Sequence, residues 1–148
     1  MPRFMLAAAH KSSGKTVVST GIAAALAARG QGPHCFKKGP DYIDPMWLAA
    51  ASGRACYNLD FNTMDAGEIG RFFDSRAGGL NLIEANKGLF DGVATDGSDS
   101  NAALAKQLDV PVVLVIDTNG MTRGIAPLLM GYLAFDPEVR IAGVILNK

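Results

Sequence analysis

The sequence predicts an α/β protein built on a doubly wound, mainly parallel sheet with helices on both faces. Apolar runs of strand length alternate with longer stretches of helical periodicity along all 148 residues. The clearest run, residues 110–116, is apolar without alternation, so helices must cover both of its faces. Strands that alternate with helices in this order imply right-handed crossovers within one sheet.

The first half of the chain predicts two strands and two helices. Residues 3–8 form an apolar run suited to a buried strand, and the Ala-rich stretch 16–29 predicts a helix that ends before Gly30. Residues 33–37 predict a short second strand. The segment 45–52 has the apolar spacing of a helix and opens with a proline, which the first turn tolerates.

The second half predicts three helices and three strands, the run at 110–116 among them. Residues 63–75 place several large apolar side chains on one side of a helix, and residues 80–85 predict the third strand. A helix over residues 101–108 follows a run of capping residues. A helix over 124–135, with a proline in its first turn, leads to a last strand at 141–146.

Composition excludes several classes of protein. Fourteen basic residues balance fourteen acidic ones, which argues against a nucleic-acid binder or a polybasic membrane binder. With 49% hydrophobic and 19% charged residues, the chain is typical of one globular domain. The longest apolar runs are far shorter than the ~20 residues that span a bilayer, and no signal-peptide cleavage region follows the first. A cytoplasmic protein is expected. Two cysteines, Cys35 and Cys56, do not make a disulfide framework.

Residues 9–16 carry the strongest local signal. Their sequence AHKSSGKT matches the phosphate-loop pattern GxxxxGK[ST] except at the first glycine, which is Ala9. In such a loop Ser12, Ser13 and Gly14 offer main-chain N–H groups to phosphate. Lys15 reaches the terminal phosphates, and Thr16 offers a hydroxyl to Mg²⁺. A strand precedes the loop and a helix follows, which predicts a P-loop NTPase-type fold with a nucleoside triphosphate site; a chance helix-capping loop is the alternative.

Acidic and basic side chains follow the predicted second and third strands. Lys37 precedes a Gly-Pro turn that projects Asp41 and Asp44 from the presumed carboxyl edge of the sheet, beside the phosphate loop. Phosphoryl transfer needs acids that place Mg²⁺ and cations that spread charge. The alternative is a solvated turn in which Asp44 caps the next helix. Glu84, at the end of the third strand, is a second candidate for the Mg²⁺ site, with a surface glutamate as the alternative.

Two further acids come at strand ends. Asp91 lies between Phe90 and Gly92, in a loop that would aim it at the same site, although an ordinary turn aspartate is the alternative. Asp117 ends the clearest strand, where a hydrogen-bonding role in the turn is equally compatible with the sequence.

Taken in order, these segments resemble the cobyrinic acid a,c-diamide synthase family, to which dethiobiotin synthetase and cobyric acid synthase are related. The resemblance covers nearly the whole chain and rests most on the segments SGKT, KKGPDYIDP, NLD and GLFDG at residues 13–16, 37–45, 58–60 and 88–92. Leu48 stands where the family often has histidine, and residues 84–87 depart from its commoner EGVM, so other tetrapyrroles such as nickel-sirohydrochlorin stay open as substrates.

The resemblance implies an ATP-dependent, amide-forming ligase of cobalamin biosynthesis. Members activate the a and c carboxylates of a corrinoid precursor, as acyl phosphates, and ammonia from glutamine converts these to amides. By resemblance, ATP and Mg²⁺ are the cofactors. The roles it assigns are ATP binding by Ser12, Ser13, Gly14, Lys15, Thr16 and Asn147, metal binding by Thr16, Asp41 and Glu84, and catalysis or substrate positioning by Lys15, Lys37, Asp44 and Asp91.

The glutaminase that would supply ammonia has no residues in this chain. A nucleophilic Cys needs a His and an orienting acid, and Cys35 lies in a predicted strand without elbow glycines. By resemblance, residues 1–148 are therefore expected to be the ATP-binding synthetase domain of a longer protein, with a C-terminal glutaminase domain as partner and a homodimer left open. The alternatives are a dethiobiotin-synthetase-like enzyme and a partition-type nucleotide-switch ATPase; His10 stands where the latter has its signature lysine.

Overall fold

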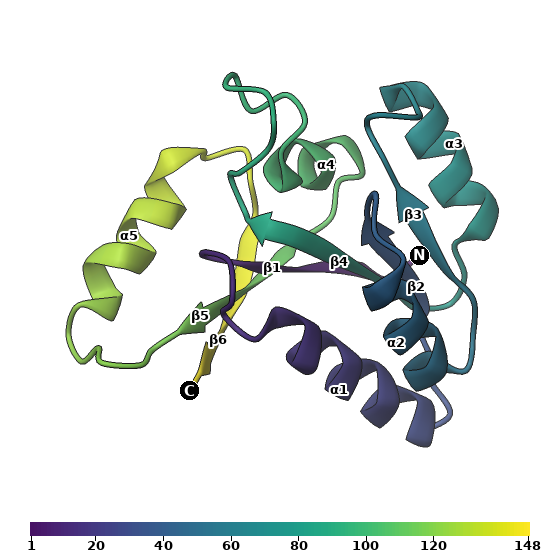
Figure 1. Ribbon diagram of the computed structural model, residues 1–148, viewed down its shortest axis with the longest axis horizontal. Helices are drawn as coiled ribbons and strands as arrows, with labels where there is room; N and C mark the ends of the chain where they lie inside the picture. The colour runs from purple at the N-terminus through teal and green to yellow at the C-terminus, as the bar shows by residue number, and fades with distance from the viewer.

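A computed structural model describes residues 1–148 as a six-stranded sheet in which every pair of neighbouring strands is parallel (Figure 1). The strand order is β3-β2-β4-β1-β5-β6, so β1 lies in the interior of the sheet and the chain winds outward from it in both directions. The strands are β1 (Arg3–Ala8), β2 (His34–Lys38), β3 (Cys56–Leu59), β4 (Asn81–Gly88), β5 (Val112–Asp117) and β6 (Ile141–Asn147). The predicted doubly wound parallel sheet is confirmed.

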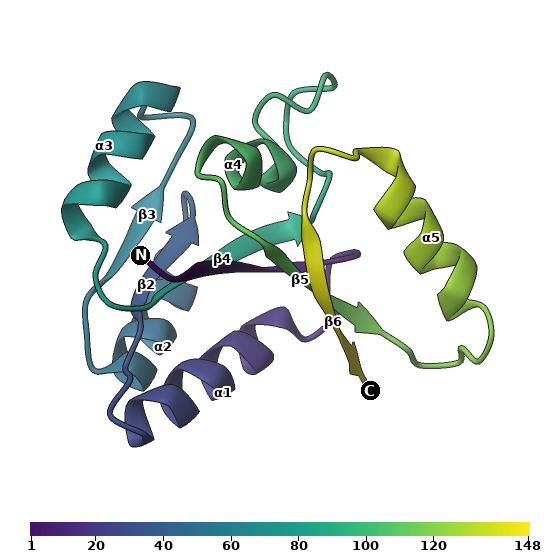
Figure 2. The same cartoon turned by 180° about the vertical axis from the view of Figure 1, so that it is seen from behind.

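Five helices cover both faces of this sheet. They are α1 (Lys15–Ala28), α2 (Ile43–Ser52), α3 (Ala66–Arg76), α4 (Asn101–Gln107) and α5 (Ile125–Phe135). Helices α1 and α2 pack together on one face, and α3, α4 and α5 lie on the other (Figures 1 and 2). None of these helices is long and apolar enough to cross a membrane.

Strand alternation divides the core and the charged side chains between the two faces. Successive residues of a strand point to opposite sides of the sheet. In β2, Cys35 joins the smaller apolar cluster under α1 and α2, whereas Phe36 joins the larger cluster under α3 and α4. Lys37 and Lys38 continue this alternation at the carboxyl end of the strand. The side chains of these two neighbouring lysines therefore lie on opposite faces of the sheet.

The sequence prediction missed one strand. β3 has only four residues, is mostly half-buried and pairs with β2 alone at the edge of the sheet. A segment this short carries too little apolar periodicity to be recognised. The third predicted strand also extends further than expected, since β4 continues to Gly88. Glu84 consequently lies inside a strand and is completely buried, not at a strand end on the surface.

Two helix starts differ from the predicted boundaries for local reasons. Helix α3 begins at Ala66, three residues later than expected, because Asp65 and Glu68 form a reciprocal capping box. Helix α2 begins at Ile43, two residues earlier than expected, so Asp44 lies within its first turn. This shift aims the carboxylate of Asp44 at the phosphate loop.

Candidate functional site

The loop between β1 and α1 has the backbone conformation that phosphate binding needs. Its left-handed residues are Ser12, with φ 68°, and Gly14, with φ 85°. Ala9 has no positive φ, so the position that departs from the phosphate-loop pattern carries a side chain without backbone strain. The departure from the consensus glycine is therefore compatible with the loop conformation.

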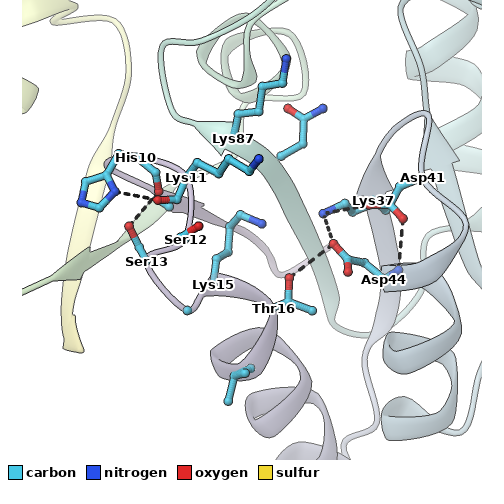
Figure 3. A pocket seen from close by; sticks show the side chains of 14 residues that line it. His10, Lys11, Ser12, Ser13, Lys15, Thr16, Lys37, Asp41, Asp44 and Lys87 are labelled. Atoms are coloured by element: carbon cyan, nitrogen blue, oxygen red, sulfur yellow. Dashed lines mark hydrogen bonds and ion pairs between the residues drawn. The ribbon is translucent and has the colours of Figure 1, made fainter. Parts of the chain in front are cut away.

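The N-terminus of α1 opens into a polar cavity of about 360 Å³. Gly14 is the N-cap residue and no side chain caps the helix, which leaves the positive end of the helix dipole available to an anion. Twelve of the fourteen residues that line the cavity are not hydrophobic. Figure 3 shows Lys11 and Lys15 extending into the space between the loop and the Lys37–Asp44 side, with Lys87 at the upper edge of the view.

Glu84 is buried behind the residues that line this cavity and joins three elements. Its Oε1 accepts hydrogen bonds from Lys15 Nζ at 3.2 Å and from Thr16 Oγ1 at 3.1 Å. Its Oε2 accepts a hydrogen bond from Ser19, one turn further along α1. Glu84 has no exposed surface, so these donors and Lys37 replace the water that its carboxylate loses.

Lys37 connects Glu84 to the loop that follows β2. Its Nζ donates to Glu84 Oε1 at 2.8 Å, to Asp44 Oδ2 at 2.7 Å and to the carbonyl of Ala85 at 3.1 Å. Parallel pairing of β2 with β4 places Lys37 directly beside Glu84 in register. The ammonium is thus fixed in three directions before any ligand binds, and its side chain is 1% exposed.

Asp41 and Asp44 have different tasks in the structure. Asp41 Oδ1 accepts the main-chain N–H groups of Ile43 and Asp44, which makes Asp41 the residue that orders the start of α2. Asp44 Oδ2 instead accepts hydrogen bonds from Lys37 and, at 3.3 Å, from Thr16 Oγ1 (Figure 3). The sequence alternative that made Asp44 a helix cap is therefore wrong: Tyr42 is the N-cap residue, and the side chain that accepts the first N–H groups is that of Asp41.

The network shifts the pKa values of its members in opposite directions. Burial lowers the pKa of Lys15, and the charge of Glu84 offsets this only in part. Burial also opposes the charge on Lys37, but Glu84 and Asp44 outweigh it and raise the pKa of Lys37. Partial burial of Asp44 is outweighed by Lys37, which holds the pKa of Asp44 below its usual value. The surroundings therefore favour the charged form of Lys37 more strongly than that of Lys15, whose one ion pair is with Glu84.

The arrangement fits a magnesium ion at Thr16. The hydroxyl of Thr16 and one oxygen each of Asp44 and Glu84 converge there, and oxygen atoms are the ligands that Mg²⁺ prefers. No three acidic, histidine or cysteine side chains gather into a metal-binding group. That suits an ion that completes its shell with water and substrate phosphate. Asp41 makes no hydrogen bond with Thr16; its Oδ2 lies 3.7 Å from Lys37 Nζ.

Three other residues considered in the sequence lie outside this network. Asp91 Oδ2 accepts the main-chain N–H of Gly88, and the residue does not line the cavity. Asn147 Nδ2 donates to the carbonyl of Ser13, so Asn147 contacts the outer side of the phosphate loop at the end of β6. Asp117 accepts the main-chain N–H of Asn119 and pairs with the Lys148 ammonium, which fulfils the turn alternative.

Ser19 is a site residue that sequence reasoning missed. It sits in an Ala-rich helix four residues beyond Lys15 and is completely buried, yet it binds Glu84, 65 residues away in the chain. Helical spacing places Lys15 and Ser19 on one face, and this was the signal available in the sequence. Only the position of β4 beside α1 shows what that face contacts.

Neither thiol has the properties of a nucleophile. Both cysteines are free, as expected. Burial raises the pKa of Cys35 to about 11 and that of Cys56 to about 12. A thiol attacks as its thiolate, so both are almost wholly protonated at neutral pH.

Sequence comparison finds relatives that span more than this chain, whereas no family model matches it. The chain is 49% identical over its whole length to the cobyrinate a,c-diamide synthase of Magnetococcus marinus, of which it covers 32%. It is 46% identical to the hydrogenobyrinate a,c-diamide synthase of Streptomyces coelicolor, of which it covers 31%. A third relative, the cobyrinate a,c-diamide synthase of Syntrophotalea carbinolica, is 41% identical over 99% of the chain. The chain thus spans about a third of the length of these relatives.

Structural comparison supports the P-loop NTPase-type fold. The signal recognition particle receptor FtsY from Elizabethkingia anophelis, in complex with GDP, superposes with a TM-score of 0.66 at 11% identity; 99% of this chain and 48% of that chain are covered. Chloroplast FtsY from Physcomitrella patens gives a TM-score of 0.58 at 17% identity, with coverage of 98% and 49%. At such low identity the likeness concerns the fold alone.

Proposed function

Because the chain is homologous along its whole length to the N-terminal part of the cobyrinate and hydrogenobyrinate a,c-diamide synthases, we propose that it binds ATP and Mg²⁺ and activates carboxylates of cobyrinate or a related tetrapyrrole for amidation. One observation carries the proposal. Two ammonium groups and a threonine hydroxyl converge on the buried Glu84 directly behind the phosphate-loop cavity, and the carboxylate of Asp44 joins them through Lys37. Charges that alternate over such short distances suit the polyanionic reactants of phosphoryl transfer.

The triphosphate of ATP would lie along the phosphate loop and the start of α1. Lys15, whose pKa burial depresses, gains a second anionic partner when phosphate enters. Lys37 keeps its charge and its three hydrogen bonds, so it spreads transition-state charge without moving. Mg²⁺ held by Thr16, Asp44 and Glu84, with Asp41 at greater distance, would neutralise charge between the β- and γ-phosphates. Asn147, beside Ser13, is placed to contact the nucleotide from the β6 side.

The chemistry proceeds in two displacement steps. A substrate carboxylate oxygen forms a bond to the γ-phosphorus while the bond to the bridging oxygen breaks, so ADP leaves and an acyl phosphate forms. Ammonia then adds to the acyl carbon, phosphate leaves with the former carboxylate oxygen, and the nitrogen loses a proton to give the amide. Asp91 is proposed to position substrate or intermediate from the β4–α4 loop.

Glutamine supplies the ammonia in this proposal, through a glutaminase domain outside residues 1–148. Support comes from the two protonated thiols, because neither Cys35 nor Cys56 can act as the glutaminase nucleophile. The curated relatives are about three times longer than this chain, which leaves room for such a domain.

Product analysis tests the proposal. A full-length protein that carries this sequence receives cobyrinate, ATP, Mg²⁺ and glutamine, and mass spectrometry follows successive conversion of two carboxylates to amides. We expect turnover that requires ATP and disappears in Lys15→Ala but persists in Lys106→Met, which removes a surface lysine. Absence of ATP-dependent amidation of both cobyrinate and hydrogenobyrinate would reject the proposal. The dethiobiotin-synthetase-like and partition-type alternatives gain no support from the three relatives reported above, which are named a,c-diamide synthases.

A further inference from the structure

A second cavity, of about 200 Å³, lies next to the phosphate-loop cavity on the α3–α4 side of the sheet edge. Its walls come from the loops that follow β2, β3 and β4, and it shares Asn86 and Lys87 with the first cavity. A molecule in the first cavity can therefore extend into the second without leaving the protein surface.

Lys38 is the feature of this second cavity that lacks an explanation within the fold. The residue is 6% exposed, and its ammonium forms no hydrogen bond or ion pair with any protein group. Its nearest aromatic neighbour is the ring of Phe61, whose centroid is 5.6 Å from Nζ. The side chain is thus almost wholly buried, while its ammonium reaches the cavity without a hydrogen-bond partner from the protein, and an anion in the cavity would supply one.

The acids that line the same cavity form no ion pair with Lys38, and their side-chain hydrogen bonds go to the backbone and to a neighbouring amide. Asp60 Oδ1 accepts the main-chain N–H and the side-chain amide of Asn62. Asp99 accepts the N–H groups of Val93 and Ala94. Burial lowers the pKa of Lys38, and the more distant charges of Asp99 and Asp60 do not restore it.

Lys87 brings a second ammonium to the boundary of the two cavities. It is the penultimate residue of β4, with a left-handed φ of 42°, and its exposed side chain has no hydrogen-bond partner within the protein. A non-glycine residue in this conformation is held against its own preference, and such strain concentrates at ligand sites. Lys38 and Lys87 thus bring two ammonium groups without hydrogen-bond partners to a cavity that Asp60 and Asp99 also line.

We propose that this second cavity binds a carboxylate of the substrate other than the one being activated, with Lys38 as the specificity-determining residue. The inference rests on the proposed function, since a substrate amidated at two positions carries at least two carboxylates. With one carboxylate at the phosphate loop, a second is held by Lys38 and Lys87, while Phe61 and Val93 offer apolar contact to the chain that bears it. Binding in this way selects polycarboxylates over simple acids.

Direct binding tests the inference. Isothermal titration with hydrogenobyrinate compares the wild-type full-length protein with Lys38→Met, Lys38→Arg and the surface control Lys106→Met. Loss of one charge-assisted hydrogen bond should weaken hydrogenobyrinate binding roughly 10- to 100-fold in Lys38→Met. ATP affinity should stay unchanged, Lys38→Arg should recover most of the binding, and Lys106→Met should match the wild type. Equal hydrogenobyrinate affinity in Lys38→Met, or a parallel loss of ATP affinity, overturns the inference.

A thermal melt distinguishes this role from a structural one. Methionine has a similar shape and no charge to desolvate, so Lys38→Met should melt at or above the wild-type temperature. A large loss of stability would mean that Lys38 supports the fold, and the inference would be wrong. Amidation assays separate the inference about Lys38 from the proposed function. Binding that depends on Lys38, without ATP-dependent amidation, rejects the proposed function alone. Amidation by Lys38→Met with an unchanged KM for the tetrapyrrole rejects the inference alone.

Discussion

Replacing Lys37 with methionine probes the charged network most severely. The ammonium is 1% exposed and makes three hydrogen bonds, two of them to carboxylates. Breaking a buried ion pair from one side costs roughly 3–5 kcal/mol, because the partner stays buried without compensation. Glu84 retains Lys15, Thr16 and Ser19, so we expect the low end, about 3 kcal/mol. For a chain of this size that corresponds to a fall in Tm of about 6–12 °C.

Urea unfolding, followed by circular dichroism and by the fluorescence of Trp47 on α2, measures this loss. The double variant Lys37→Met/Glu84→Gln should regain part of it, since the fully buried carboxylate beside residue 37 is then gone and only the partly exposed Asp44 and Asp41 remain. The Lys106→Met control breaks an exposed pair and should cost about 0.5 kcal/mol or less. A Lys37→Met variant as stable as this control would show that the ammonium of Lys37 does not stabilise buried Glu84, which would contradict the charged network described for the site.

Three further predictions follow from the same contacts. Lys15→Ala should lower ATP affinity roughly 10- to 100-fold while circular dichroism stays unchanged, because its ammonium faces the cavity; equal binding of a fluorescent ATP analogue would contradict this. The pKa of Asp44 is depressed, so the stability that its ionised carboxylate contributes is complete above the ordinary pKa near 3.9 and is lost as pH falls through the lower pKa of the folded state. The difference in unfolding free energy between wild type and Asp44→Asn should therefore shrink in acid. A difference that stays constant would refute the pairing with Lys37. With pKa values of about 11 and 12, Cys35 and Cys56 should react with a disulfide reagent at pH 8 roughly 100-fold or more slowly in the native state than in urea; rapid native reaction would rule out the burial described.

The fold was largely predictable because apolar periodicity encodes it. The run at 110–116 indicated a strand covered on both faces, and Val112–Asp117 is such a strand, paired on both sides. β3 escaped prediction because its four residues stabilise the sheet through pairing with β2, a long-range contact that no local pattern records. The predicted helix boundaries were wrong where a side chain, such as Asp65, caps the helix at a different residue.

Site residues could be predicted only where a single continuous segment contains a recognisable binding motif. Lys15 and Thr16 follow from the phosphate-loop pattern, and the structure brings them to Glu84 and Asp44. That Glu84 is buried, and that Asp44 and not Asp41 reaches Thr16, depends on strand register and on where α2 begins. Lys38 was not singled out in the sequence, and strand alternation places it on the opposite face of the sheet from Lys37.

An isotope measurement tests the central claim, which is transfer of the γ-phosphoryl group from ATP to a substrate carboxylate in this cavity. Cobyrinate labelled with ¹⁸O in its carboxylates is turned over by the full-length protein with ATP, Mg²⁺ and glutamine, and the released phosphate is analysed by mass spectrometry. An acyl phosphate carries one carboxylate oxygen into phosphate, so the account predicts one ¹⁸O in phosphate for each amide formed. Amide formation that releases unlabelled phosphate would contradict it.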